Sequence, residues 1–135
     1  MAFIDWSQQY SVGVRQFDDQ HKKLIALVNE LHEAMKSGKG KEVLAHVLGE
    51  LVSYTRTHFK AEEQLMQIHA YPDAAAHRQL HEELTEKAVA LKRDLEAGNS
   101  MLTLPVMDFL KTWLQNHIMG TDKKYTAFFN GKGVQ

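Results

Sequence analysis

The sequence predicts an all-α protein: an antiparallel up-down-up-down four-helix bundle with an extended N-terminal arm and a short C-terminal helix. Apolar residues recur at helical spacing along most of the chain, and no stretch of useful length shows a β pattern. The interruptions at 37–40, 70–73 and 97–100 are short and contain the glycine, proline or asparagine that ends helices. Short connections favour antiparallel neighbours, so four helices joined in this way are expected to form a bundle.

The composition is that of one globular domain spanning residues 1–135, with 44% hydrophobic and 24% charged residues. The formal net charge of −1 gives no field that would recruit nucleic acid or an anionic membrane surface. The absence of cysteine excludes disulfides, thiolate nucleophiles and cysteine-ligated metals. No export signal and no run of roughly 18 apolar residues is visible, so we expect a cytoplasmic protein without membrane insertion.

The first helix is expected over residues 18–37, after an extended arm of residues 1–17. Asp18 or Asp19 is a suitable N-cap, because a carboxylate can accept hydrogen bonds from the free N–H groups of the first turn. The stripe of this helix that should face the core consists of His21, Leu24, Val28, Leu31 and Met35.

The second helix is expected over residues 41–69. Its inward stripe mixes apolar residues with an imidazole and a carboxylate, and consists of Leu44, Leu51, Thr55, His58, Glu62 and Leu65. The run that would otherwise be a simple buried helix therefore places polar groups where its own pattern favours leucine.

The third helix is expected to begin after Asp73, a suitable cap, and to end near residue 97. Its stripe is His77, His81, Leu84, Ala88, Leu91 and Leu95. The fourth helix should begin near Thr103, with Pro105 tolerated in its first turn. Its stripe is Val106, Leu110, Trp113, Leu114 and His117, and residues 122–130 are expected to form the short terminal helix.

The polar members of these stripes converge on one end of the predicted bundle. His21 lies 17 residues before Gly38 and His58 lies 18 residues after Gly40, so at a rise of about 1.5 Å per residue they are level across the first hairpin. Two pairs at i, i+4 spacing point the same way on their helices, namely His58 with Glu62 and His77 with His81.

Five imidazoles and a carboxylate facing an interior would each cost at least about 1–3 kcal/mol if nothing satisfied them. A bound cation would satisfy them all, so their convergence predicts a metal site. Asp122 is harder to place, because five residues after His117 is about 140° around a regular α-helix. Gly120 could end the helix between them, or a π-bulge could align the pair, and the sequence leaves both alternatives open.

With these motifs the chain resembles the bacterial hemerythrin family over nearly its whole length. The elements of the resemblance are WSQQYSVGVRQFDDQHKKL leading into His21, HFKAEE with His58 and Glu62, HRQLH with His77 and His81, and HIMGTD with His117 and Asp122. The bundle expected from periodicity agrees with the resemblance, because a relative of this family, myohemerythrin, is an up-and-down four-helix bundle.

The resemblance implies a non-haem centre of two iron ions bridged by an oxo or hydroxo group. It implies that Glu62 and Asp122 bridge both ions, that His77, His81 and His117 bind one, and that His21 and His58 bind the other. One coordination position would stay open, beside a set of apolar or nearly apolar side chains: Leu24, Phe59, Trp113, Leu114 and Ile118.

The function implied is reversible binding of dioxygen, for carriage, storage or delivery to an oxygen-consuming enzyme, and not catalysis. Two alternatives are a module that senses oxygen, redox state or iron, and a di-iron enzyme acting on peroxide or nitric oxide. The Glu-x-x-His pairs of ferritin-like oxidases and the HExxH motif of zinc proteases are both absent from the sequence.

The remaining histidines and one glutamate are not expected to bind metal. His32 lies on the same face as His21 but about 16 Å further along the helix, and His46 and His69 are expected at the surface or in a loop. Glu63 is rotated about 100° from the His58 stripe and is interpreted as a solvated charge.

Overall fold

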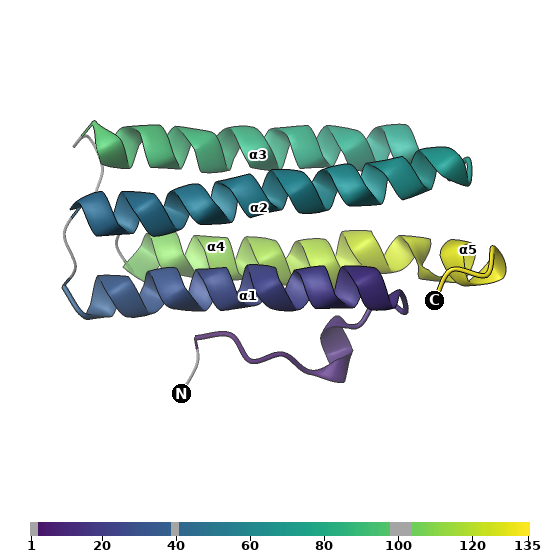
Figure 1. Ribbon diagram of the computed structural model, residues 1–135, viewed down its shortest axis with the longest axis horizontal. Helices are drawn as coiled ribbons and strands as arrows, with labels where there is room; N and C mark the ends of the chain where they lie inside the picture. The colour runs from purple at the N-terminus through teal and green to yellow at the C-terminus, as the bar shows by residue number, and fades with distance from the viewer. Residues whose placement is uncertain (1–2, 39–40, 98–103) are drawn as a thin grey trace.

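A computed structural model describes residues 3–38, 41–97 and 104–135 of the chain. Four long antiparallel helices form the molecule, as Figure 1 shows: α1 (Arg15–Lys36), α2 (Lys41–Ile68), α3 (Ala74–Glu96) and α4 (Leu104–Asn116). The chain continues from α4 through a π-helical turn, η2 (His117–Thr121), and a 3-10 turn, η3 (Asp122–Tyr125), into α5 (Thr126–Gly131). The predicted four-helix bundle with a C-terminal helix is confirmed, and the described residues contain no strand.

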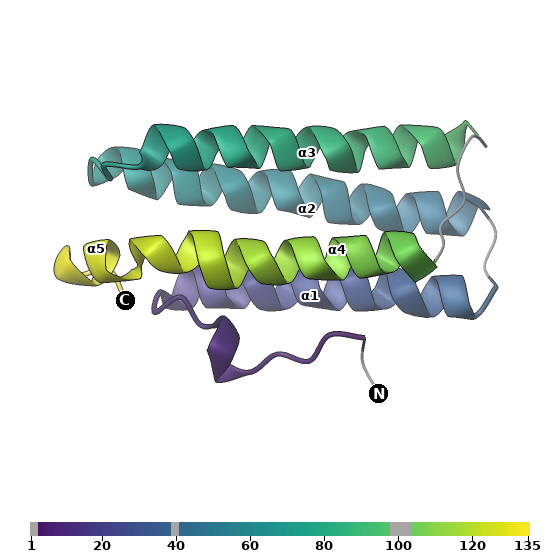
Figure 2. The same cartoon turned by 180° about the vertical axis from the view of Figure 1, so that it is seen from behind.

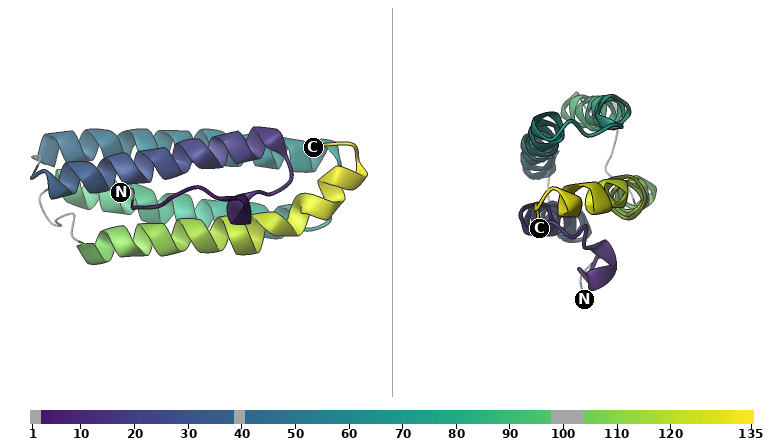
Figure 3. Two further views of the ribbon diagram at one scale, coloured as in Figure 1. Left: turned by 90° about the horizontal axis from the view of Figure 1, so that it is seen from below. Right: turned by 90° about the vertical axis from the view of Figure 1, so that its right-hand side faces the viewer.

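Seen along its axis, the bundle has one helix at each corner of a square (Figure 3). Helices α1 and α2 lie on one side and α3 and α4 on the other, as the front and back views show (Figures 1 and 2). The middle of the bundle is filled by fully buried aliphatic side chains such as Val28 and Leu31 of α1 and Leu48 of α2. Burial of each such side chain stabilises the fold by about 1.5–3 kcal/mol.

The predicted boundaries of α2 and α3 agree with the structure to within one residue. The predicted start of the fourth helix, Thr103, lies outside the described residues, and α4 is described from Leu104. The predicted terminal helix at 122–130 is divided between the 3-10 turn η3 and α5. None of the helices in the described part of the chain combines the length and the apolar character needed to cross a bilayer.

The predicted start of the first helix at residue 18 is wrong, because α1 begins at Arg15 and its N-cap is Val14. Asp18 lies in the first turn instead, and its side chain turns back toward the preceding loop. Its Oδ2 accepts a hydrogen bond from Ser11 Oγ at 2.6 Å, and its Oδ1 accepts one from the Val12 N–H at 2.8 Å. The carboxylate therefore fixes the entry of the chain into α1, where a negative charge also suits the helix dipole.

The N-terminal arm packs along the bundle, as Figure 3 shows from below. It is extended as predicted except for a single 3-10 turn, η1 (Gln8–Tyr10). Asn29 of α1 holds the arm through a pair of 2.8 Å hydrogen bonds with the N–H and C=O of Ile4. Gln115 of α4 donates a 2.7 Å hydrogen bond to the Tyr10 hydroxyl, so the arm is tied to two helices.

The predicted core stripe of α3 is less buried than expected. Leu84, Ala88 and Leu91 are only half-buried. They face a cavity of about 340 Å³ between α2, α3 and α4, whose opposite wall includes Phe109 and Trp113. The C-terminal half of α3 therefore packs mainly on α2.

Candidate metal centre

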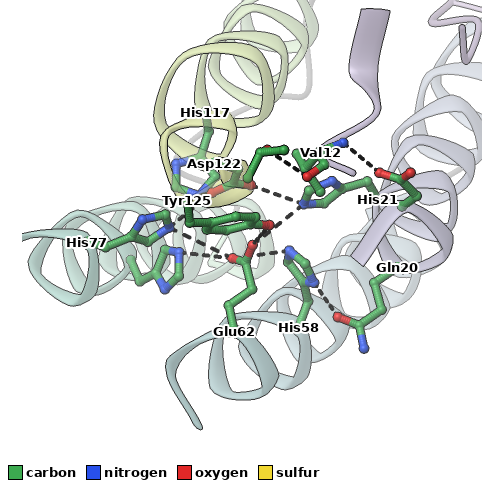
Figure 4. A network of polar contacts seen from close by, with 12 residues as sticks. Val12, Gln20, His21, His58, Glu62, His77, His117, Asp122 and Tyr125 are labelled. Carbon is green, nitrogen blue, oxygen red and sulfur yellow. Dashed lines mark hydrogen bonds and ion pairs between the residues drawn. The ribbon is translucent and has the colours of Figure 1, made fainter. Parts of the chain in front are cut away.

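Seven polar side chains meet at one end of the bundle, where α1 and α3 begin and α2 and α4 end (Figure 4). All seven are buried. They are contributed by α1, α2, α3, η2 and η3, and they are the seven predicted site residues: His21, His58, Glu62, His77, His81, His117 and Asp122. The structure thus brings together residues that span about 100 positions of the sequence.

Five of these residues form a first group whose donor atoms all lie within 4.8 Å of one another: Glu62, His77, His81, His117 and Asp122. Asp122 Oδ1 lies 3.0 Å from His77 Nε2 and 3.1 Å from His117 Nε2. Glu62 Oε1 lies 3.3 Å from His81 Nε2. This group contains three imidazoles.

The second group contains His21, His58, Glu62 and Asp122, again with donor atoms within 4.8 Å of one another. Asp122 Oδ2 lies 3.0 Å from His21 Nε2, and Glu62 Oε1 lies 3.4 Å from His58 Nε2. Both carboxylates are shared by the two groups. Asp122 presents one oxygen to each group, which is the placement that a bridging carboxylate requires.

The donor set fits a pair of metal ions. Nine buried side-chain atoms have no hydrogen-bond partner within the described chain, and all belong to these residues: both ring nitrogens of His21, Nε2 of His58, His77, His81 and His117, Oε1 of Glu62, and Oδ1 and Oδ2 of Asp122. Each such atom costs about 1–3 kcal/mol when it is left unsatisfied. Nitrogen–oxygen separations near 3 Å are those of adjacent ligands on one ion, with bonds of about 2.1 Å at right angles.

The π-helical turn η2 decides how Asp122 joins the site. In a π-helix the hydrogen bonds run from residue i to i+5, so residues five apart come to the same side of the chain. His117 begins this turn, and Asp122 follows its last residue, Thr121. Of the two alternatives left open by the sequence, the structure has the π-bulge, and the helical path continues past Gly120.

The two carboxyl groups have opposite pKa shifts. Burial, and then the charge of Asp122, raises the pKa of Glu62 to about 7. Burial would also raise the pKa of Asp122, but the charge of His117 and the contacts with His117, His21 and His77 hold it well below its usual range. Burial acts to lower the pKa of His117, yet the neighbouring Asp122 carboxylate raises it. In the metal-free protein the negative charge is therefore concentrated on Asp122.

The other two shifted histidines are kept neutral. Burial, and then the nearby His77, lowers the pKa of His81 to about 4. Burial, and then the nearby His21, lowers the pKa of His58 well below its usual value. Neutral imidazole is the form that binds metal ions, so these side chains are ready to coordinate at neutral pH.

Two further residues that contact the site were not identified from the sequence. The buried Tyr125 hydroxyl donates a hydrogen bond to Glu62 Oε2. Gln20 Oε1 accepts a 2.5 Å hydrogen bond from His58 Nδ1, as Figure 4 shows. For Tyr125, the sequence offered one signal: it follows Asp122 by three residues, a spacing that places both on one side of a helix.

The interpretation of Glu63 as a solvated charge is wrong. Its side chain is only 29% exposed, and Oε2 accepts a 3.0 Å hydrogen bond from His81 Nδ1. The 100° rotation that moves Glu63 off the His58 stripe turns it toward α3, where His81 lies. The hydrophobic periodicity of α2 shows which residues share a face, but it does not show where the neighbouring helix lies.

Aromatic side chains lie against the histidines. Phe59 stacks on His81 with ring centroids 3.7 Å apart and planes 2° apart, and Trp113 lies 6.3 Å from His117 in a nearly parallel orientation. The other apolar residues predicted beside the open position are all buried: Leu24, Leu114 and Ile118.

The histidines that were not expected to bind metal lie outside both groups. His32 is half-buried and stacks on Phe3 with a centroid distance of 4.0 Å. His46 is exposed and lies 3.1 Å from Glu50. His69 follows the last residue of α2 and packs edge-on against Phe129.

Comparison with known proteins gives consistent results. The family model of the hemerythrin HHE cation binding domain matches residues 12–129. The bacteriohemerythrin of Methylococcus capsulatus is 35% identical over 126 residues, covering 93% of this chain and 95% of that protein. The bacteriohemerythrin of Stenotrophomonas maltophilia is 34% identical over 93% of this chain and 80% of that protein. The crystal structure of a wild-type hemerythrin superposes with a TM-score of 0.88 at 33% identity, covering 93% of this chain and 97% of the other.

Proposed function

Since this chain belongs to the hemerythrin family, we propose that it binds dioxygen reversibly at a non-haem di-iron centre. The observation that carries the proposal is the set of buried polar atoms without hydrogen-bond partners, which, apart from His21 Nδ1, lie in two groups that share Glu62 and Asp122. Imidazole and carboxylate donors suit iron, and two shared carboxylates call for two adjacent ions.

The proposed ligands divide into two unequal sets. His77, His81 and His117 would hold one ion, His21 and His58 would hold the other, and Glu62 and Asp122 would bridge them. If each ion is six-coordinate, the seven residues and one bridging oxygen leave about one position open, on the ion with two histidines. When bound, the iron pair supplies the redox chemistry, one electron from each ferrous ion to dioxygen and back again on release.

The side chains of the protein hold the ligands in place and exclude water. The Tyr125 hydroxyl fixes the orientation of the Glu62 carboxylate, and Phe59 fixes the ring plane of His81. Buried apolar side chains such as Leu114 and Ile118 provide no proton donors. Cleavage of the O–O bond and loss of superoxide both benefit from protons and water, so a dry, aprotic wall favours reversible binding over catalysis.

We propose a carrier or store of dioxygen, with an oxygen-consuming enzyme as its recipient. The test is anaerobic loading of the metal-free protein with ferrous iron, followed by metal counting and repeated cycles of air and argon. We expect two iron ions per chain and an absorption band that appears in air and disappears under argon. An iron-replete protein whose spectrum does not respond to the gas contradicts the proposal.

Two variants complete this experiment. His58→Ala should lower the iron content or speed irreversible oxidation, because it removes one of only two histidines from its ion. The exposed His46→Ala is the matched control and should cycle like the wild type. Steady turnover of peroxide or nitric oxide by the loaded protein would favour an enzyme instead.

A further inference from the structure

We infer that Glu63 and Gln20 are positioning residues that make the two metal positions unequal, so that the three-histidine position fills before the two-histidine position. The inference rests on the proposed di-iron function and concerns residues outside the seven ligands. It depends on the side chain that accepts a hydrogen bond from Nδ1 of one histidine in each group. This nitrogen lies on the side of the ring that faces away from the metal position.

Behind His81, in the three-histidine group, lies a carboxylate. Glu63 Oε2 accepts the hydrogen bond from His81 Nδ1 at 3.0 Å, while His81 Nε2 faces the centre. Glu63 Oε1 faces Arg78 Nε at 3.7 Å, and that arginine is 68% exposed and lies 3.4 Å from Glu82 as well. This ion pair is weak because Arg78 is largely exposed, so the arginine offsets little of the attraction between Glu63 and the His81 N–H.

Behind His58, in the two-histidine group, lies a neutral amide. Gln20 Oε1 accepts the hydrogen bond from His58 Nδ1 at 2.5 Å, and His58 Nε2 faces the centre. Both imidazoles therefore carry a proton on Nδ1, and both point Nε2 toward the centre. They differ in the charge of the group that accepts their outer N–H.

This difference changes the strength of the two ligands. A carboxylate that accepts the outer N–H pulls the proton toward itself, which makes the inner nitrogen of the ring a stronger donor to a cation. An amide acceptor orients the ring but adds no charge. Removal of such an outer partner usually weakens metal binding about 10–100-fold.

The orientation of His81 is fixed from a second direction. Phe59 lies flat on its ring at 3.7 Å, whereas it lies tilted and 5.9 Å from His58. Edge contacts with Phe17 and His21 hold the ring of His58 as well, so the difference between the two metal positions rests on the outer hydrogen-bond acceptors.

The test is an anaerobic titration of the metal-free protein with Fe²⁺, followed by calorimetry and competition with a chromophoric chelator. The wild type should bind two ions in two resolved steps. Glu63→Gln keeps the shape of the side chain and should weaken the first step about 10–100-fold while the second step is unchanged. Gln20→Glu should strengthen the second step by about tenfold or more and reduce the gap between the steps.

Glu82→Gln is the matched control, because it removes the other carboxylate next to Arg78 without touching His81. Both of its steps should match the wild type. Helical circular dichroism and the urea midpoint of each metal-free variant should also match, because Glu63, Gln20 and Glu82 all lie at least partly exposed. Two equal steps in the wild type, or an unchanged first step in Glu63→Gln, overturns the inference. Binding of fewer than two ions by the wild type contradicts the proposed di-iron function itself.

Discussion

Tyr125 is a buried residue whose single polar atom is committed to the site. Its ring packs between Phe17 and Phe129, and its hydroxyl donates to Glu62 Oε2. Burial, and then the charges of Glu62 and Asp122, raises the pKa of Tyr125 well above its usual value, so the hydroxyl keeps its proton. The residue therefore serves as a permanent hydrogen-bond donor to one oxygen of Glu62.

Tyr125→Phe should destabilise the metal-free protein by about 1–3 kcal/mol, because Glu62 Oε2 then has no donor and remains buried. Urea unfolding at pH 8 measures the change in the free energy of unfolding. Tyr54→Phe is the control, since Tyr54 is only half-buried, and it should stay within about 0.5 kcal/mol of the wild type. Equal losses in the two variants would contradict the role given to the hydroxyl.

Metal binding should release protons near neutral pH. The pKa of Glu62 is raised to about 7, so below that pH the carboxyl holds a proton that a cation must displace. His117, whose pKa is also raised, must lose its proton too, whereas His58, His81 and Asp122 have lowered pKa values and are already deprotonated. Iron affinity should therefore rise as the pH increases through 7.

Calorimetry of iron loading in buffers of different ionisation enthalpy measures this release. These five groups should contribute about two protons at pH 6 and almost none above the raised pKa values of Glu62 and His117, so the total release should fall as the pH rises. A release that is independent of pH between 6 and 9 would contradict the assigned shifts.

At the scale of elements, the π-helical turn η2 sets the position of the last two site residues. A regular helix would place Asp122 about 140° from His117, whereas the π turn brings Asp122 Oδ1 to 3.1 Å from His117 Nε2. One additional residue in one turn therefore decides whether the second carboxylate reaches the site.

Insertion of one alanine after the exposed Met119 should rotate Asp122 away from the other ligands by about 100°, because the π turn already accommodates one additional residue. We expect iron content to fall from two ions per chain to one or fewer, measured after anaerobic loading. Gly120→Ala is the control, because a Cβ at Gly120 meets nothing within 4 Å. This variant should keep two ions, and an insertion variant that also keeps them would show that the helical phase of this turn does not position Asp122.

The elements also show which parts of the site the sequence could predict. His58 with Glu62 and His77 with His81 were predictable, because regular α-helical geometry alone places i, i+4 pairs on one face. Asp122 was placed only by resemblance, since local spacing did not decide between a helix end and a π turn. Glu63 was misassigned because its role depends on its contact with His81 of α3. The pattern of a single helix does not show how two helices pack against each other.

At the scale of the whole molecule, the order of the four helices was predictable from short connections and helical periodicity. The half-burial of Leu84, Ala88 and Leu91 was not, because the apolar pattern of α3 shows which side faces inward and not how closely α4 approaches. The start of α1 was also missed by three residues, since Asp18 had the composition of an N-cap but bonds to Ser11 and Val12 instead.

Removal of metal should lower the stability of the entire bundle, because it leaves the ligand nitrogens and oxygens that face the centre buried without partners. Each ion present at about 100 times its dissociation constant stabilises the fold by about 2.7 kcal/mol, so two ions contribute about 5 kcal/mol. For a domain of this size we expect the melting temperature to fall by about 20 °C on chelation. Differential scanning calorimetry of the loaded and chelated protein measures this shift, and identical melting temperatures would contradict metal binding at this site.

The seven residues lie on α1, α2, α3 and the turns η2 and η3 that continue α4, and this distribution has a consequence for motion. No helix can detach from the loaded centre without breaking at least one of its contacts, so local opening at that end should be suppressed and amide hydrogen exchange there should require global unfolding. At the opposite end, where α3 borders the cavity, no such restraint exists among the described residues, and amides of α3 near Leu91 should exchange through smaller, independent fluctuations. We therefore expect the end of the bundle that holds the metal to be rigid and the opposite end to be flexible.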